Sequence, residues 1–353
     1  MEKLTVLLPG EISDRLKMML EYSLKSYHFE IIKTSDEIID LKNKRILFAV
    51  ELNQTGINIE LFKMLEKIKL GEDNFLEGSV GSIVVNSSNE FFTRNISRMI
   101  ILYANMAGCL FIGRPLLEAT GSLKGFSSYT KKYDMDLYEA CVNEFKKTVE
   151  SLVDFKIKQF QKPKIIALHA SNYKTSNTLA LWQMVKENLK NQNVEIKEIH
   201  IENGSVKDCR GCVYTACKHF SKYTNCFYGG VMVEEVYPAI IESDILIMLC
   251  PNYNDSISAN MSAVINRLTA LFRKVKFYDK YLYSVIVSGH SGSDIIAEQL
   301  ISALNINKTF MLPPKFALME TANDMGEIYK VENIELKAKN FAENIIKTVI
   351  DKR

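Results

Sequence analysis

The sequence predicts an α/β protein of two tandem doubly wound domains, each with a five-stranded parallel sheet flanked by helices. Its apolar runs do not alternate with polar residues, which indicates strands buried on both faces. These runs alternate with segments of helical periodicity, as in doubly wound α/β folds. The pattern occurs twice along 353 residues, a length that suits two domains better than one.

Each half of the chain has five predicted strands, and segments of the two halves resemble one another in the same order. Residues 46–50 parallel residues 245–249, and residues 115–121 parallel residues 314–321, which indicates an internal repeat. The predicted strands are 5–8, 29–33, 46–50, 82–85 and 109–112 in the first half, and 165–168, 194–201, 245–250, 283–288 and 309–312 in the second.

A domain boundary is expected in the polar segment 159–163, Gln-Phe-Gln-Lys-Pro, because its final proline cannot continue a helix. The predicted domains are therefore residues 1–158 and residues 163–353.

Composition narrows the class of protein. Lys and Arg number 44 against 42 Asp and Glu, so no strongly basic face is required and nucleic acid is not an expected partner. The longest apolar runs are far too short to span a membrane, and the chain start lacks a signal-peptide pattern. We expect a cytoplasmic protein without a membrane partner.

A polar loop follows the first strand of the second domain. Ser171, Thr175, Ser176 and Thr178 offer hydroxyl groups and Asn177 offers an amide, directly before a predicted helix. The free N–H groups at a helix start favour an anion, and ligands of doubly wound sheets bind beyond the carboxyl ends of the strands. The sequence therefore predicts a phosphate loop, with a plain helix cap as the simpler alternative.

Two later loops of the second domain also carry motifs of polar residues and glycine. The loop Pro251-Asn-Tyr-Asn-Asp-Ser-Ile-Ser-Ala259 follows the third strand, and Ser288-Gly-His-Ser-Gly292 follows the fourth. With Ser176-Asn-Thr178, these motifs give residues 163–325 a resemblance to the flavodoxin-like NADPH-dependent FMN reductase family, including its iron–sulfur flavoprotein branch. Each domain is accordingly expected to be flavodoxin-like.

The resemblance implies that the second domain binds FMN and uses NAD(P)H as co-substrate. The first loop would hold the phosphate, the second would flank the flavin ring, and glycines would let the third approach closely. His290 is either a contact to reduced flavin or a surface residue. Because FMN itself supplies the hydride chemistry, we name no catalytic side chain. The candidate FMN-binding residues are Ser171, Tyr173, Thr175, Ser176, Asn177, Thr178, Pro251, Asn252, Tyr253, Asn254, Ser256, Ser288, Gly289, His290 and Gly292.

Four of the seven cysteines, Cys209, Cys212, Cys217 and Cys226, crowd into one segment of the second domain. The iron–sulfur flavoprotein branch carries a compact four-cysteine cluster at this point, although the spacing here is wider. Three interpretations remain open, namely an iron–sulfur cluster that passes single electrons to the flavin, a zinc site, and free thiols.

We interpret the first domain as a degenerate copy of the second. Its corresponding loop has Glu11 and Asp14, and two carboxylates repel a phosphate, so we predict that this domain binds no FMN. The resemblance implies dimers with the flavin near the subunit interface. The first domain is therefore expected to replace a partner subunit in an intrachain pseudo-dimer, and further homodimerisation remains open.

The expected function is NAD(P)H-dependent oxidoreduction, in which bound FMN passes hydride or electrons to a small acceptor such as a quinone or a flavin. One alternative is an iron–sulfur flavoprotein that carries electrons to a redox protein. Another is a non-catalytic flavin-binding sensor.

Overall fold

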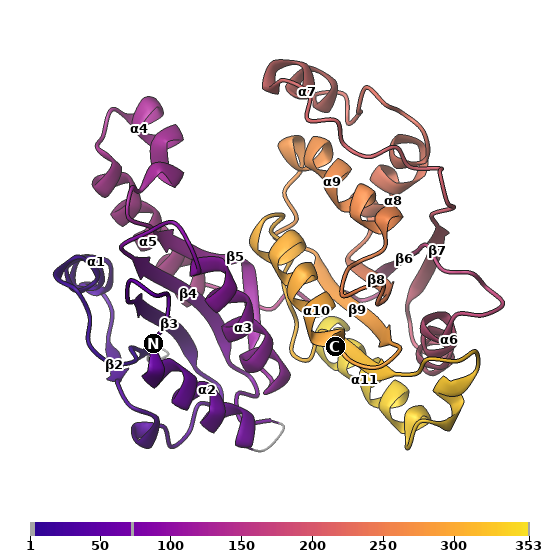
Figure 1. Cartoon of the computed structure of the whole chain (residues 1–353), viewed down its shortest axis with the longest axis horizontal. Helices are drawn as coiled ribbons and strands as arrows, with labels where there is room; N and C mark the ends of the chain where they lie inside the picture. Colours follow the sequence, from indigo (N-terminus) through magenta and orange to yellow (C-terminus); the bar gives the residue numbers. More distant parts are fainter. Residues whose placement is uncertain (1–3, 72–73, 352–353) are drawn as a thin grey trace. The chain divides into compact units, whose positions relative to one another are not determined.

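The chain forms two compact units, Met1–Lys156 and Ile157–Arg353, called here the N-terminal and C-terminal units. The computed structural model describes residues 4–71 and 74–351 (Figure 1). The outermost residues of the two predicted domains, 1–3 and 352–353, lie outside this description.

The N-terminal unit contains a five-stranded sheet of order β2-β1-β3-β4-β5 in which every pair is parallel. Its strands are β1 (Leu4–Leu7), β2 (Phe29–Ile32), β3 (Arg45–Leu52), β4 (Val80–Ser87) and β5 (Leu110–Ala119). Its helices are α1 (Asp14–Leu24), α2 (Ile59–Leu70), α3 (Thr93–Met106), α4 (Ser127–Tyr133) and α5 (Leu137–Val153).

The C-terminal unit contains a second parallel sheet, of order β10-β9-β8-β6-β7. Its strands are β6 (Lys164–His169), β7 (Glu195–His200), β8 (Ile245–Pro251), β9 (Tyr281–Ser288) and β10 (Ala317–Thr321). Its helices are α6 (Asn177–Leu189), α7 (Tyr214–Ser221), α8 (Tyr237–Glu242), α9 (Ala259–Lys274), α10 (Ser293–Leu300) and α11 (Ile334–Val349), with π-helical turns at Met232–Val236 and Ile301–Ile306.

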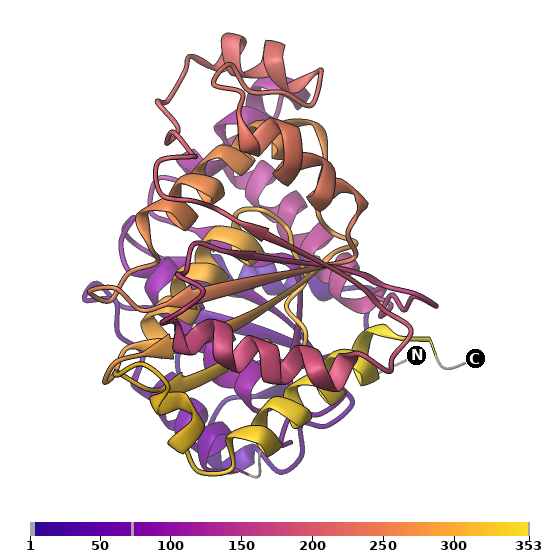
Figure 2. The ribbon, with the colours of Figure 1, turned by 90° about the vertical axis from the view of Figure 1, so that its right-hand side faces the viewer.

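Both sheets have the same strand order, second-first-third-fourth-fifth, and the predicted fold class is confirmed. In this order the winding direction reverses between the first and third strands, which is where flavodoxin-like folds bind ligands. In the C-terminal unit that point lies between β6 and β8. Helices α6 and α11 pack together on one face of this sheet, and α9 lies across the other (Figure 2).

The fifth strand of the C-terminal unit was predicted in the wrong place, at 309–312. The paired strand is β10, which aligns Ala317 with Ser284 of β9, whereas Met311 forms only an isolated bridge to Tyr281. Pro313 and Pro314 lie between the two segments and lack the N–H groups that a ladder needs. The N-terminal unit shows the same interruption as a register shift in β5, beside Pro115.

The buried strands account for the apolar runs. Ile245, Leu246, Ile247 and Leu249 of β8 have no exposed surface, so this strand lies inside the sheet with both faces covered. Trp182 of α6 is also fully buried, and its indole N–H donates to Glu198 Oε1 at 2.9 Å.

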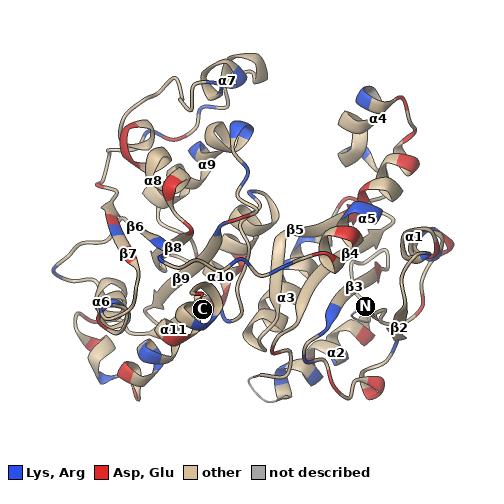
Figure 3. Cartoon of the chain, turned by 180° about the vertical axis from the view of Figure 1, so that it is seen from behind, with Lys and Arg blue, Asp and Glu red and all other residues tan. Residues whose placement is uncertain are grey.

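Positions of Lys and Arg and positions of Asp and Glu are intermixed along the ribbons of the two units (Figure 3). Within residues 4–71 and 74–351, no helix combines the length and the apolarity needed to cross a bilayer.

Candidate functional site

The first loop of the C-terminal unit runs from the end of β6 to the start of α6. Ser171 is 2 % exposed, and its hydroxyl group has no hydrogen-bond partner. Ser176 is the N-cap of α6, and its side chain accepts a hydrogen bond from the Leu179 N–H at 3.2 Å. The loop thus contains a buried, unpaired hydroxyl and ends at a capped helix start, where backbone donors and the helix dipole favour an anion.

The other candidates in this loop differ in their surroundings. The Asn177 amide donates to Ala322 O at 3.2 Å and Asp324 O at 2.8 Å, and its carbonyl accepts from Gly326 N at 3.0 Å. Its side chain therefore fixes the segment after β10. Thr178 is buried, Thr175 is exposed, and Tyr173 is 63 % exposed.

The second loop leaves β8 and turns back on itself. Tyr253 and Ser256 exchange backbone hydrogen bonds of 3.2 and 3.1 Å, with Asn254 and Asp255 at positive φ between them. Tyr253 is 55 % exposed at this turn. The Oδ1 atom of Asn252 and the Oγ atom of Ser258 are buried and have no partner.

The third loop is joined to the second. Asn252 Nδ2 donates to Ser291 O at 3.0 Å and to Asp255 Oδ1 at 3.3 Å. A Cβ atom on Gly292, whose φ is +87°, would lie 2.4 Å from Asp255 Oδ1, so only glycine permits this approach. Ser288 is buried and its hydroxyl pairs with Ser293 Oγ at 2.7 Å, Gly289 approaches Asn323, and His290 is exposed.

The three loops emerge at one edge of the sheet, because β6, β8 and β9 are parallel neighbours. Four residues at this edge have buried polar side-chain atoms without a partner: His169, Ser171, Asn252 and Ser258. Buried polar groups are nearly always paired in native proteins, so this group indicates a site completed by a polar ligand. Sequence reasoning missed His169 and Ser258, although a histidine that ends an apolar strand is a usable signal.

The same edge of the N-terminal unit is closed by a side chain of the protein itself. Glu51, in β3, accepts hydrogen bonds from the Ser13 N–H at 3.2 Å and the Ser13 hydroxyl at 2.9 Å, at the N-cap of α1. Asn86 Nδ2 donates to both Glu51 carboxylate oxygens, at 2.8 and 2.9 Å. A carboxylate thus lies at the helix start where a phosphate would bind.

Arg15 extends this network across the sheet edge. Its guanidinium donates to Asn86 Oδ1 at 2.7 Å and to the backbone oxygens of Ser87 at 2.7 Å and Ala119 at 2.9 Å. Glu11 and Asp14, which the sequence offered as the repelling carboxylates, are exposed on either side of Ser13. The carboxylate that takes the anion position, Glu51, could not be identified from the loop sequence alone.

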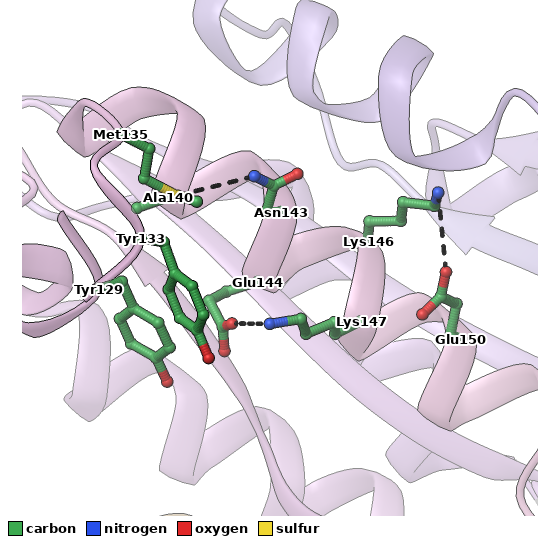
Figure 4. Close-up of a pocket in the computed structure, with 9 residues that line it drawn as sticks. All are labelled: Tyr129, Tyr133, Met135, Ala140, Asn143, Glu144, Lys146, Lys147 and Glu150. Carbon is green, nitrogen blue, oxygen red and sulfur yellow. Dashed lines mark hydrogen bonds and ion pairs between the residues drawn. The ribbon is translucent and has the colours of Figure 1, made fainter.

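Among the described residues of the N-terminal unit, two of the hollows bear on the question of a ligand. One, of about 500 Å³, is beside the first loop and includes Glu11, Lys33 and Glu60, so its charge does not suit a dianion. The other, of about 350 Å³, lies between α4 and α5, where Tyr129 and Tyr133 lie side by side and Lys147 pairs with Glu144 at 2.6 Å (Figure 4).

Of the four clustered cysteines, Cys217 lies in α7, Cys209 and Cys212 precede it and Cys226 follows it. Cys209 and Cys212 are exposed, Cys217 and Cys226 are partly exposed, and all four are free thiols. Arg273 Nε donates to Cys217 Sγ at 3.2 Å. In the described residues, no three His, Cys, Asp or Glu side chains are placed to hold a metal ion. The arrangement gives no support to an iron–sulfur or zinc site, and no electron-transfer step is derived through one.

Comparison with known families agrees with the resemblance that the sequence predicts for the C-terminal unit. Residues 163–324 match the family described as NADPH-dependent FMN reductase, and the match lies entirely within the C-terminal unit. The predicted resemblance is confirmed over these residues. The matched region is thus similar to a family of flavin-dependent, NADPH-using reductases. Among curated proteins, none matches the chain.

Several solved structures are similar to the chain. The NAD(P)H:quinone oxidoreductase of Methanothermobacter marburgensis is 13 % identical, with 52 % of this chain and 99 % of that chain covered and a TM-score of 0.40. An azoreductase of Bacillus anthracis is 13 % identical, with 53 % and 100 % covered and a TM-score of 0.39.

Replacing the carboxylate at the N-terminal edge is expected to destabilise that unit and to expose its helix start. Glu51→Ala should lower the free energy of unfolding by about 1–2 kcal/mol, because Ser13 and Asn86 lose their acceptor. Inorganic phosphate should stabilise the variant more than the wild type. Denaturant unfolding with and without phosphate measures both effects, with the exposed Glu66→Ala as the matched control. Equal stability of the two variants would contradict the assigned role of Glu51.

Thiol labelling is expected to divide the seven cysteines into two classes. Burial raises the pKa of Cys141 and of Cys250 to about 12 and raises that of Cys109 further, so these three should stay unlabelled in the folded protein. Cys209, Cys212, Cys217 and Cys226 should react at about pH 8. Peptide mass spectrometry after brief alkylation resolves each site. Protection of all four clustered thiols, relieved by a chelator, would show that a metal centre exists.

Proposed function

We propose that the protein is an NAD(P)H-dependent oxidoreductase that holds FMN at the carboxyl edge of the C-terminal sheet and reduces a small acceptor such as a quinone or a free flavin. The observation that carries this proposal is the buried, unpaired hydroxyl of Ser171 in the loop that leads from β6 to α6. The family match of residues 163–324 supports the class of reaction.

The first loop suits the phosphate of FMN. The Ser171 hydroxyl can donate to a phosphate oxygen, and the first N–H groups of α6 lack acceptors within the helix. The α6 dipole adds a partial positive charge at the same place. Since the Asn177 side chain is already paired with backbone groups, its contribution would be restricted to its backbone N–H.

The second and third loops suit a flat ring. The Asn252–Ser291 hydrogen bond and the close approach at Gly292 fix these loops against each other before any ligand arrives. Tyr253 offers an exposed aromatic surface, and Asn252 and Ser258 offer unpaired buried oxygens. Bound FMN would supply the hydride chemistry, while these residues orient it.

We propose further that the N-terminal unit supports turnover without a flavin of its own, as an internal counterpart of a partner subunit. The hydrogen-bonded Glu51 carboxylate supports the absence of a second flavin. If so, a chain of residues 157–353 that folds and binds FMN should still oxidise NADPH several-fold more slowly than the whole protein. Equal turnover, measured after matching flavin content, would rule this role out.

Ser171→Ala is the variant that tests the FMN site. It should lower FMN affinity about 10- to 100-fold, because a hydrogen bond to a charged group is lost. The free energy of unfolding of the flavin-free protein should stay constant or rise by up to about 1 kcal/mol, since an unpaired buried hydroxyl is removed. Fluorescence titration and denaturant unfolding measure the two effects.

Ser23→Ala is the matched control, because the Ser23 hydroxyl is equally buried and unpaired but lies on α1 of the N-terminal unit. It should leave FMN affinity unchanged. The wild-type protein should also oxidise NADPH when a quinone is added. FMN binding that is unaffected by Ser171→Ala would refute the proposed phosphate site, and bound FMN that NADPH does not reduce would refute the proposed reaction.

A further inference from the structure

Three aromatic side chains gather where β6 passes into the first loop. His169 ends β6 and is aligned with His200, which ends β7. Their rings are stacked, with centroids 4.8 Å apart and planes inclined by 16°. The ring of Tyr173, from the loop itself, meets both histidines edge-on at 5.2 Å.

His169 is unusual in this group because it is fully buried and neither ring nitrogen makes a hydrogen bond of ordinary geometry. The backbone of Ser171 nevertheless lies close enough to favour the protonated ring. Burial, and next the neighbouring His200, lower the pKa of His169 to about 4, so the ring is neutral near neutral pH. A histidine kept only for packing would leave two buried ring nitrogens without a hydrogen bond of ordinary geometry, which is unfavourable.

The charged groups around this ring come from several elements. Glu198 of β7 favours the protonated ring but is already engaged by Trp182 and Lys186 of α6, whose hydrogen bonds lower the pKa of Glu198 against the effect of burial. The adjacent strand β8 places Leu249 beside His169. No strong anion therefore compensates a proton on His169 in the described structure, and an anion bound by the loop would do so.

We propose that His169 is a proton-linked positioning residue of the first loop. When a phosphate dianion binds there, the His169 ring takes one proton from solvent and donates a charge-assisted hydrogen bond to the loop backbone, which holds the loop around the anion. When the dianion leaves, the proton returns to solvent. This inference rests on the proposed FMN site.

The direction of the pH effect follows from linkage. The ring binds a proton more tightly in the complex, so lowering the pH favours the complex, by up to about tenfold in affinity per pH unit below the pKa of the ring in the complex. The phosphate group of FMN has its own pKa of about 6. Affinities should therefore be measured between about pH 6.5 and 8, where the phosphate is mostly a dianion.

Calorimetric titration of the full-length protein at about pH 7, in buffers of different ionisation enthalpy, counts the protons taken up per FMN bound. The wild type should take up a substantial fraction of a proton with FMN and none with riboflavin, which lacks the phosphate. His169→Gln should abolish the uptake and flatten the pH dependence of FMN affinity. The control His28→Gln, at an exposed position of the N-terminal unit, should change neither.

The outcomes separate this inference from the proposed function. Absence of FMN binding by the wild type would overturn the proposed FMN site itself. FMN binding without proton uptake, or with equal uptake in His169→Gln, would overturn the role of His169. If His169→Gln fails to fold, the wild-type comparison decides, because equal uptake with riboflavin and FMN would exclude a phosphate-linked proton.

Discussion

Both units are shaped by one constraint, namely that polar groups buried at the carboxyl edge of a parallel sheet need partners. The N-terminal unit supplies them from its own chain. Glu51 accepts from Ser13 and Asn86, and Arg15 donates across the ends of the neighbouring strands. The C-terminal unit leaves them unpaired at Ser171 and at three further residues of the same edge. One edge is complete as folded, whereas the other leaves polar groups that a ligand could pair.

The contrast supports the proposal that two units of one fold differ in function. A helix start attracts negative charge whether the charge belongs to a ligand or to the protein. A carboxylate attached to β3 is always present at the start of α1, so it fills the anion position at every ligand concentration. In the C-terminal unit the side chain that accepts from the start of α6 is the Ser176 hydroxyl, not a carboxylate, and the second and third loops are joined by the Asn252–Ser291 contact and the close approach at Gly292.

The sequence predicted the fold well because buried parallel strands give long apolar runs and helices give a distinct period. It misplaced the fifth strand because residues 309–312 are as apolar as a strand, whereas the two prolines after them limit their pairing with β9 to an isolated bridge. It identified the loops by their polar residues but not the partners of each side chain, as with Asn177. It missed Glu51 because its partners Ser13 and Asn86 lie 38 and 35 residues away along the chain. It missed His169 because the stacking of this ring on His200 depends on the alignment of two strands.

Hydrogen exchange on the full-length protein, with and without FMN, tests the central contrast most directly. FMN should slow amide exchange in peptides that cover residues 171–180, 251–259 and 288–293, because the ligand would supply the missing partners at that edge. Peptides that cover residues 9–16 should be unaffected, since Glu51 already fills the corresponding position. Slowed exchange at residues 9–16, or unchanged exchange at residues 171–180 with FMN bound, would contradict this account.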